Sequence, residues 1–178
     1  MEIITVQDKS FKPYISEEDL QLSVQSVADQ INNDYKGSEP LFLGVLNGSF
    51  MFFSDLLKSI GLECQVSFVK LSSYEGTKTT GKVDELIGLT ESIEGRDVII
   101  IEDIVDTGNT LERLHKILSK GNAKSLKIAT LLHKPSVYKK EYLIDYIGIE
   151  IPNRFVLGYG LDYNGLGRNL SSIYVLNE

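Results

Sequence analysis

Acidic and small polar residues are concentrated in one short stretch of the chain, directly after an apolar run. Val98–Ile101 are four consecutive β-branched residues, which favours a strand buried on both faces in the middle of a parallel sheet. Two acids and a turn of small polar residues follow: Glu102, Asp103, Asp106, Thr107, Gly108, Asn109 and Thr110. Apolar residues then recur at helical spacing, so the turn places backbone N–H groups at a helix start. The stretch therefore predicts an anion-binding loop beside carboxylates.

An anion site beside carboxylates is an unusual combination, because like charges repel. It is expected if the ligand carries both a phosphate and neutral hydroxyl groups, with a divalent cation offsetting the excess negative charge. A phosphorylated sugar fits that description, and ligands of open α/β sheets commonly lie at the ends of central strands. The structural alternative is that these residues form only a turn and a helix cap, with hydrated acids at the strand end.

A second apolar run, Leu41–Leu46, is also followed by small polar residues, Asn47, Gly48 and Ser49. A helical pattern over Phe50–Ile60 comes next. A strand that leads into a small-residue loop at a helix start is a second potential anion site. Taken alone, this pattern favours an ordinary strand–helix turn.

The other patterns indicate one α/β domain over residues 1–178. Ser16 begins a capping box, and the helix that follows has an apolar stripe. Leu86–Leu89 and Asp97–Ile101 are expected to be neighbouring strands on either side of a turn at Glu94-Gly95. Further strands are expected over 64–71, 124–132, 144–149 and 173–176, with an edge strand or extended arm within 1–15.

The polar connection over 72–84 is longer than most connections between elements and predicts a mobile lid, with a floppy hairpin as the alternative. A lid would protect a reactive sugar cation from water.

The run from Ile101 to Thr110 resembles the phosphoribosyl-diphosphate (PRPP) binding motif of type I phosphoribosyltransferases. The stretch Phe155–Asn164 resembles a second signature, and together the matches indicate the hypoxanthine-guanine phosphoribosyltransferases over about Leu41–Leu170. The resemblance implies the type I phosphoribosyltransferase fold, with a central, mainly parallel sheet flanked by helices. It also implies a small hood, mainly from about 1–15 and 134–178, and a mobile active-site loop at 72–84.

The resemblance assigns the PRPP side of the site. It implies that Glu102 and Asp103 bind the ribose hydroxyls and that the 5′-phosphate lies on Asp106–Thr110. The diphosphate would be bound by Leu46, Asn47, Gly48, Ser49 and Arg168. The family typically has Lys at the position of Asn47, so no charge is expected from that side chain. Mg²⁺ is the implied cofactor, with Glu102, Asp103 and Asp162 as the residues that hold it.

The purine side follows from the same resemblance. Lys134 would donate to the exocyclic oxygen of a 6-oxopurine, which suits an ammonium group because it can only donate. Phe155 would stack on the base and Val156 would contact its edge, with Asp162 nearby. Asp106 would exchange a proton with purine N7 as the catalytic acid–base group. Ser73 and Tyr74 match the Ser-Tyr pair of the family's lid, whereas His133 has no assigned role.

Composition limits the other functions. The net charge is −7, and no dense Lys/Arg cluster is present, so a stable nucleic-acid partner is not expected. An RNA-binding regulator of the pyrimidine-operon type on the same fold, or a transferase for uracil, adenine or xanthine, stays as an alternative.

The single cysteine, Cys64, excludes an internal disulfide. There is no membrane-length apolar run and no signal-peptide pattern, so a cytoplasmic location is expected. The family resemblance implies a homodimer or homotetramer.

Overall fold

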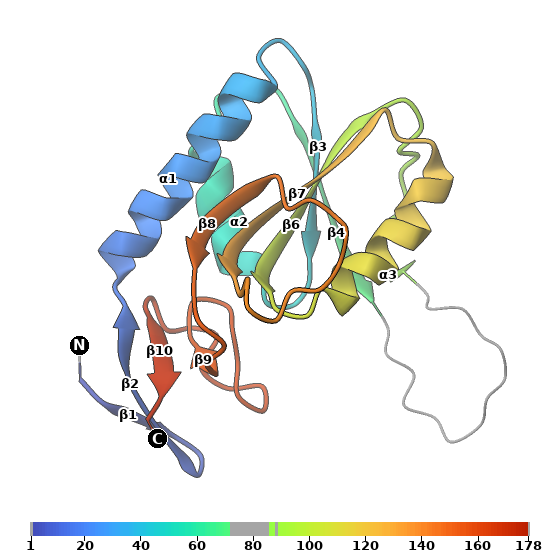
Figure 1. The fold of residues 1–178 in the computed structure, drawn as a ribbon. Helices are drawn as coiled ribbons and strands as arrows, with labels where there is room; N and C mark the ends of the chain where they lie inside the picture. Colours follow the sequence, from blue (N-terminus) through green and yellow to red (C-terminus); the bar gives the residue numbers. More distant parts are fainter. Residues whose placement is uncertain (1, 72–85, 88, 178) are drawn as a thin grey trace, which may run out of the picture.

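The computed structural model describes the chain apart from residues 1, 72–85, 88 and 178. Its centre is a sheet in the order β5-β4-β3-β6-β7-β8, parallel in every described pairing except that of β4 with β5 (Figure 1). The strands are β3 (Leu41–Val45), β4 (Gln65–Leu71), β5 (Leu86–Ile87), β6 (Asp97–Val105), β7 (Ser125–His133) and β8 (Tyr146–Glu150). The predicted mainly parallel sheet is confirmed, with β6 inside it.

One expected neighbour relation is wrong. The strands around Leu86 and Asp97 do not pair, because β4 and β3 lie between β5 and β6. Instead β5 pairs antiparallel with β4, across the connection that precedes it. The apolar β6 pairs with the parallel strands β3 and β7, which bury both of its edges.

Helices cover both faces of this sheet. On one face lie α1 (Glu17–Asp34) and α2 (Phe50–Lys58), which pack on Ile99 and Ile101 of β6. On the other face lies α3 (Asn109–Leu118), followed by the short 3₁₀ helix η1 (Ser119–Gly121), and it packs on the alternate residues Val98 and Ile100. The alternation of β6 side chains thus gives each face its own core. Figure 1 shows the helices on the two faces of the sheet.

The two ends of the chain meet in a second, antiparallel sheet in the order β1-β2-β10-β9. Its strands are β1 (Ile4–Val6), β2 (Lys9–Ile15), β9 (Val156–Leu157) and β10 (Ile173–Leu176). This sheet is the hood expected from the terminal segments, and it lies beyond one end of the central sheet (Figure 1). Phe11 and Leu157, both fully buried, lie in its separate apolar cluster.

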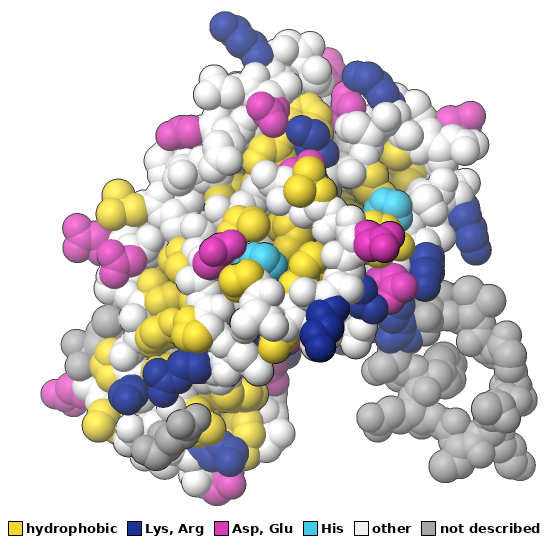
Figure 2. Space-filling model, in the orientation of Figure 1, with side chains coloured by type: hydrophobic (Ala, Val, Ile, Leu, Met, Phe, Trp, Pro, Cys, Tyr) yellow, Lys and Arg dark blue, Asp and Glu magenta, His cyan; other side chains and the backbone are white. Residues whose placement is uncertain are grey.

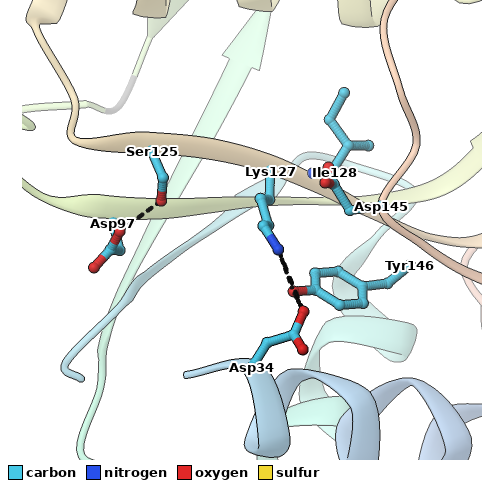
Figure 3. Close-up of polar contacts among 7 residues, drawn as sticks. All are labelled: Asp34, Asp97, Ser125, Lys127, Ile128, Asp145 and Tyr146. Carbon is cyan, nitrogen blue, oxygen red and sulfur yellow. Dashed lines mark hydrogen bonds and ion pairs between the residues drawn. The ribbon is translucent and has the colours of Figure 1, made fainter. Parts of the chain in front are cut away.

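The amino-terminal edge of the central sheet is closed by polar contacts (Figure 3). Lys127 of β7 donates to the Tyr146 hydroxyl oxygen at 3.1 Å, and that hydroxyl donates to Asp34 of α1 at 2.7 Å. The Tyr146 hydroxyl and the Lys127 ammonium lower the pKa of Asp34. This network fixes the end of α1 against β7 and β8, whereas the site residues predicted after β3 and β6 lie at the opposite, carboxyl edge. In the described part of the chain, no helix has the length and hydropathy of a membrane span.

Candidate active site

A cavity of about 330 Å³ lies at the carboxyl ends of β3 and β6. It is lined by Val45, Leu46, Gly48 and every residue from Glu102 to Leu111. The loop between β6 and α3 is set by Gly108, whose φ of +79° is a conformation that L side chains rarely adopt. The Gly108 carbonyl accepts from Glu112 N at 2.9 Å and so begins α3. The backbone of the loop is thereby placed at a helix N-terminus, as an anion site requires.

Two neighbouring acids form the floor of this cavity. Glu102 is buried, and its desolvation, together with the charge of Asp103, raises its pKa well above the ordinary value. Desolvation also raises the pKa of Asp103, although the Ile104 N–H donates to its Oδ1 at 2.9 Å. Two adjacent carboxyls in one buried site resist simultaneous ionisation. The site therefore favours a ligand or cation that restores charge balance.

The loop after β3 approaches these acids closely. A Cβ at Gly48 would overlap the Asp103 carboxylate, so only glycine fits there. The Leu46–Asn47 peptide bond is cis, and Leu46 N donates to Val69 O at 2.8 Å. Ser49 is fully buried, and its hydroxyl donates to Val45 O at 2.6 Å. From this loop the cavity wall takes Leu46 and Gly48, while the Ser49 hydroxyl points back into the fold.

A second cavity of about 320 Å³ adjoins the first, and the two share Asp103, Ile104 and Asp106. Its other walls are Lys134, Phe155, Val156, Leu161 and Asp162. Lys134 follows the end of β7 and is only 6% exposed, with its Nζ 2.8 Å from Asp106 Oδ2. Phe155 is 45% exposed, so much of its ring is available to a ligand. This cavity combines an aromatic face with a cation, which suits a planar ring that carries an acceptor.

The hood lines the second cavity and approaches the loop after β3 through a small number of contacts. Arg168 binds Asp162 Oδ1 through Nη2 at 2.6 Å and donates from Nη1 to Gly160 O at 2.7 Å. Gly160 lies against the loop after β3, since a Cβ there would overlap the Gly48 carbonyl oxygen. The arginine is therefore fixed near the loop after β3, although it lines neither cavity.

A family model described as the phosphoribosyl transferase domain matches residues 17–164. The chain belongs to this family. It is 43% identical to the hypoxanthine-guanine phosphoribosyltransferase of Bacillus subtilis over 166 residues, which cover 93% of this chain and 92% of that protein. It is also 43% identical over 166 residues to the bifunctional protein TilS/HprT of Listeria monocytogenes, but spans only 26% of that protein's length.

Solved structures agree with the sequence comparison. A hypoxanthine phosphoribosyltransferase from Staphylococcus aureus is 42% identical, with a TM-score of 0.85 over 93% of this chain and 91% of that one. The Trypanosoma cruzi enzyme, studied for the role of its C-terminal region in oligomeric state, is 34% identical, with a TM-score of 0.85 over 98% and 95% of the two chains. The type I phosphoribosyltransferase fold is thus confirmed.

The structure brings most of the predicted phosphoribosyltransferase residues to two joined cavities, but it does not gather the three predicted metal-binding acids. In the part of the chain that is described, no three His, Cys, Asp or Glu side chains form a group that could hold a metal ion. Asp162 is paired with Arg168 instead, whereas Glu102 and Asp103 lie together. The lid residues Ser73 and Tyr74 fall outside the described residues.

Sequence reasoning missed the contact that fixes the hood to the core. Tyr159, between two glycines of the hood, is 2% exposed and its hydroxyl donates to Asp55 of α2 at 2.6 Å. Gln21 of α1 also donates to that carboxylate, at 2.9 Å. The alternation of apolar residues around Tyr159 predicts only core packing, and nothing in the spacing of Asp55 and Tyr159 relates the two.

We predict that Glu102→Gln stabilises the ligand-free chain at neutral and alkaline pH. The folded state binds the Glu102 proton more tightly than the unfolded chain, so the stability from that proton is fully present below the unfolded pKa of 4.5. It is lost as pH rises through the folded pKa. A neutral amide removes this pH-dependent loss, and the gain in free energy of unfolding should be about 2 kcal/mol near pH 8.

Thermal or urea unfolding across pH 5–9 measures this effect. Glu112→Gln is the matched control, because Lys140 and Lys116 lower the pKa of Glu112 to about 2 and its neutralisation should not stabilise the fold. Equal stability of wild type and Glu102→Gln at every pH would contradict the prediction.

Proposed function

We propose that the protein salvages purines by Mg²⁺-dependent transfer of the 5-phosphoribosyl group from PRPP to N9 of hypoxanthine or guanine. The products are IMP or GMP and pyrophosphate. The observation that carries the proposal is the pair of adjoining cavities that share Asp103, Ile104 and Asp106. One has an anion loop with two acids, and the other has an aromatic ring with a lysine. The sugar and the base of one nucleotide fit such a pair, with the reacting bond between them.

On the sugar side, the loop from Asp106 to Thr110 binds the 5′-phosphate through backbone N–H groups and two threonine hydroxyls. Glu102 and Asp103 accept hydrogen bonds from the ribose hydroxyls. Their buried oxygens also fit a hard divalent cation such as Mg²⁺, with further ligands from the substrate. When bound, Mg²⁺ would offset the charge of the diphosphate leaving group.

On the base side, Phe155 provides the stacking face and Val156 contacts the edge of the ring. Lys134 donates to the O6 carbonyl, which favours a 6-oxopurine over adenine, because the amino group of adenine is not an acceptor. Without a base, the Lys134 ammonium is satisfied by Asp106 at 2.8 Å. The ion pair with Asp106 thus holds the Lys134 ammonium in position before the base binds.

Asp106 is the group placed to move a proton. It lies at the junction of the two cavities and is half exposed on the ligand side, so its free oxygen can meet N7 of a purine stacked on Phe155. As the C1–diphosphate bond weakens and N9 attacks, the purine loses a proton, and a carboxylate at N7 can take it. Arg168 and the loop over Leu46–Ser49 stabilise the departing diphosphate.

Nucleotide formation with hypoxanthine, guanine, xanthine, adenine and uracil, each with PRPP and with or without Mg²⁺, tests this function. Hypoxanthine and guanine should react only with Mg²⁺, and adenine and uracil should not react. RNA retention on filters at low and moderate salt tests the regulator alternative. Lys and Arg side chains gather beside α3 on the face that Figure 2 shows. On α3 and in the segment after β7, Lys116 and Lys140 are paired with Glu112. RNA binding without nucleotide formation would overturn the proposal.

We predict that Asp106→Asn lowers kcat by about 10²–10⁴-fold, because the amide cannot accept the purine proton. The KM for PRPP should change by about threefold or less, since the backbone of the loop still binds the phosphate. Steady-state kinetics measure both constants, with Asp29→Asn on the exposed face of α1 as the control. Equal losses in kcat and in PRPP affinity would exclude the acid–base role.

We also propose a cytoplasmic homo-oligomer, a homodimer or homotetramer. Phe68 and Val66 of β4 are 40% and 43% exposed, and Phe50 at the start of α2 is 41% exposed. Phe68 packs against Phe53, one helical turn from Phe50, so these side chains share one apolar face that a second copy would cover. Sedimentation velocity should give a dimer or tetramer for wild type and a lower state for Phe68→Ser. A wild-type monomer at micromolar concentration would contradict this proposal.

A further inference from the structure

The basic side chains described at the two cavities are already engaged by carboxylates. Lys134 pairs with Asp106, and Arg168 pairs with Asp162. A diphosphate adds several negative charges to a place where two further acids lie buried. Coulomb repulsion in such a partly desolvated site is costly, even with one divalent cation present. The loop that receives the diphosphate therefore needs a cation that is not held by another carboxylate.

Lys70 is a cation in that position. The hydrogen bond from Leu46 N to Val69 O places the end of β4 beside the loop after β3. The Lys70 ammonium donates to the side-chain oxygen of Asn47 at 3.5 Å. Within residues 2–71, 86–87 and 89–177, no carboxylate forms an ion pair with Lys70, and Asn47 is neutral. Among these residues, therefore, no carboxylate neutralises the charge of the Lys70 ammonium.

The direction of the side chain follows from the alternation of β4. Val69 is buried, whereas Phe68 and Lys70 point to the opposite face. The Phe68 ring meets Phe53 of α2 at a centroid distance of 5.2 Å, so this is the face on which α2 begins. Lys70 is exposed and lies next to the N-terminus of α2, where the helix dipole adds to its positive potential.

We propose that Lys70 binds the diphosphate of PRPP and so supplies the positive charge of the loop after β3. This inference rests on the proposed function. A bond of 3.5 Å to an amide oxygen is weak, so the ammonium exchanges it readily for a charge-assisted bond to a phosphate oxygen. Asn47 holds the ammonium beside the loop until the ligand arrives.

The test is the affinity of the full chain for pyrophosphate with Mg²⁺ and for PRPP, measured by calorimetry. Lys70→Met should weaken both by about 5–20-fold, and Lys70→Arg should keep affinity within about threefold, since an arginine also carries the charge. The defect should shrink at high ionic strength because it is electrostatic. Lys36→Met, an exposed lysine just after α1 at the other edge of the sheet, is the matched control and should bind like wild type.

A double variant that moves the positive charge from position 70 to position 47 gives a more specific test. Asn47→Lys in the Lys70→Met background should recover most of the lost affinity, because the ammonium then sits on the loop itself. Unchanged affinity of Lys70→Met for both ligands would overturn the role of Lys70. The role would also be overturned if Lys70→Arg lost as much affinity as Lys70→Met and if Asn47→Lys did not restore binding in the Lys70→Met background. If wild type bound no PRPP and formed no nucleotide, the proposed function would fail instead, so the two failures are distinguishable.

Discussion

Two carboxyl groups buried side by side at the end of the central strand are the constraint on which the site depends. Glu102 and Asp103 cannot move away from each other, because β6 is held on both edges by parallel strands and on both faces by apolar residues. Desolvation raises the pKa of both groups, and the charge of Asp103 raises the pKa of Glu102 further. The ligand-free protein thus carries an unfavourable arrangement that the surrounding core stabilises. A ligand that brings hydroxyl donors and a cation relieves it.

The position of the hood follows from this need to enclose a charged ligand. Its sheet is built from both ends of the chain: β10 pairs with β2, and β9, which follows Phe155, pairs with β10. Tyr159 then joins the hood to α2 through Asp55, and Gly160 lies directly on Gly48. A larger residue at Gly160 would push the hood away from the loop after β3, and one at Gly48 would displace the Asp103 carboxylate. Glycine at these two points therefore lets the hood, the loop after β3 and the end of β6 lie close together.

The sequence predicts well those parts of the structure that depend on the spacing of residue types within a short segment. The β-branched run of β6, the helix stripes and the turn at Asp106–Thr110 are each decided within a few neighbouring residues. Sequence reasoning failed for β5, which pairs with β4 and not with β6, because the choice of partner depends on contacts across the sheet. The hood is predicted only through the family resemblance, because its strands come from opposite ends of the chain and no local spacing relates them.

The sequence also does not predict the hydrogen-bond and ion-pair partners of individual side chains. Ser49 has the residue type of a phosphate ligand, yet its hydroxyl is used by Val45 O. Asp162 has the type of a metal ligand, yet it holds Arg168. Neither outcome can be read from spacing, because a polar side chain bonds to whichever partner the fold brings near.

These pairings also shape how the site binds its ligand. Lys134 and Arg168, which the base and the diphosphate would recruit, are each held in place by an acid, which keeps a long side chain ordered while the site is empty. Binding then exchanges one charge-assisted contact for another, so the net gain from each cation is small. Affinity must come from groups that no ion pair among the described residues holds: the backbone of the phosphate loop, the exposed face of Phe155, Lys70, and the two acids Glu102 and Asp103 with their cation. In such an active site the ion pairs keep the side chains ordered and selective. The groups outside these ion pairs then contribute most of the binding free energy.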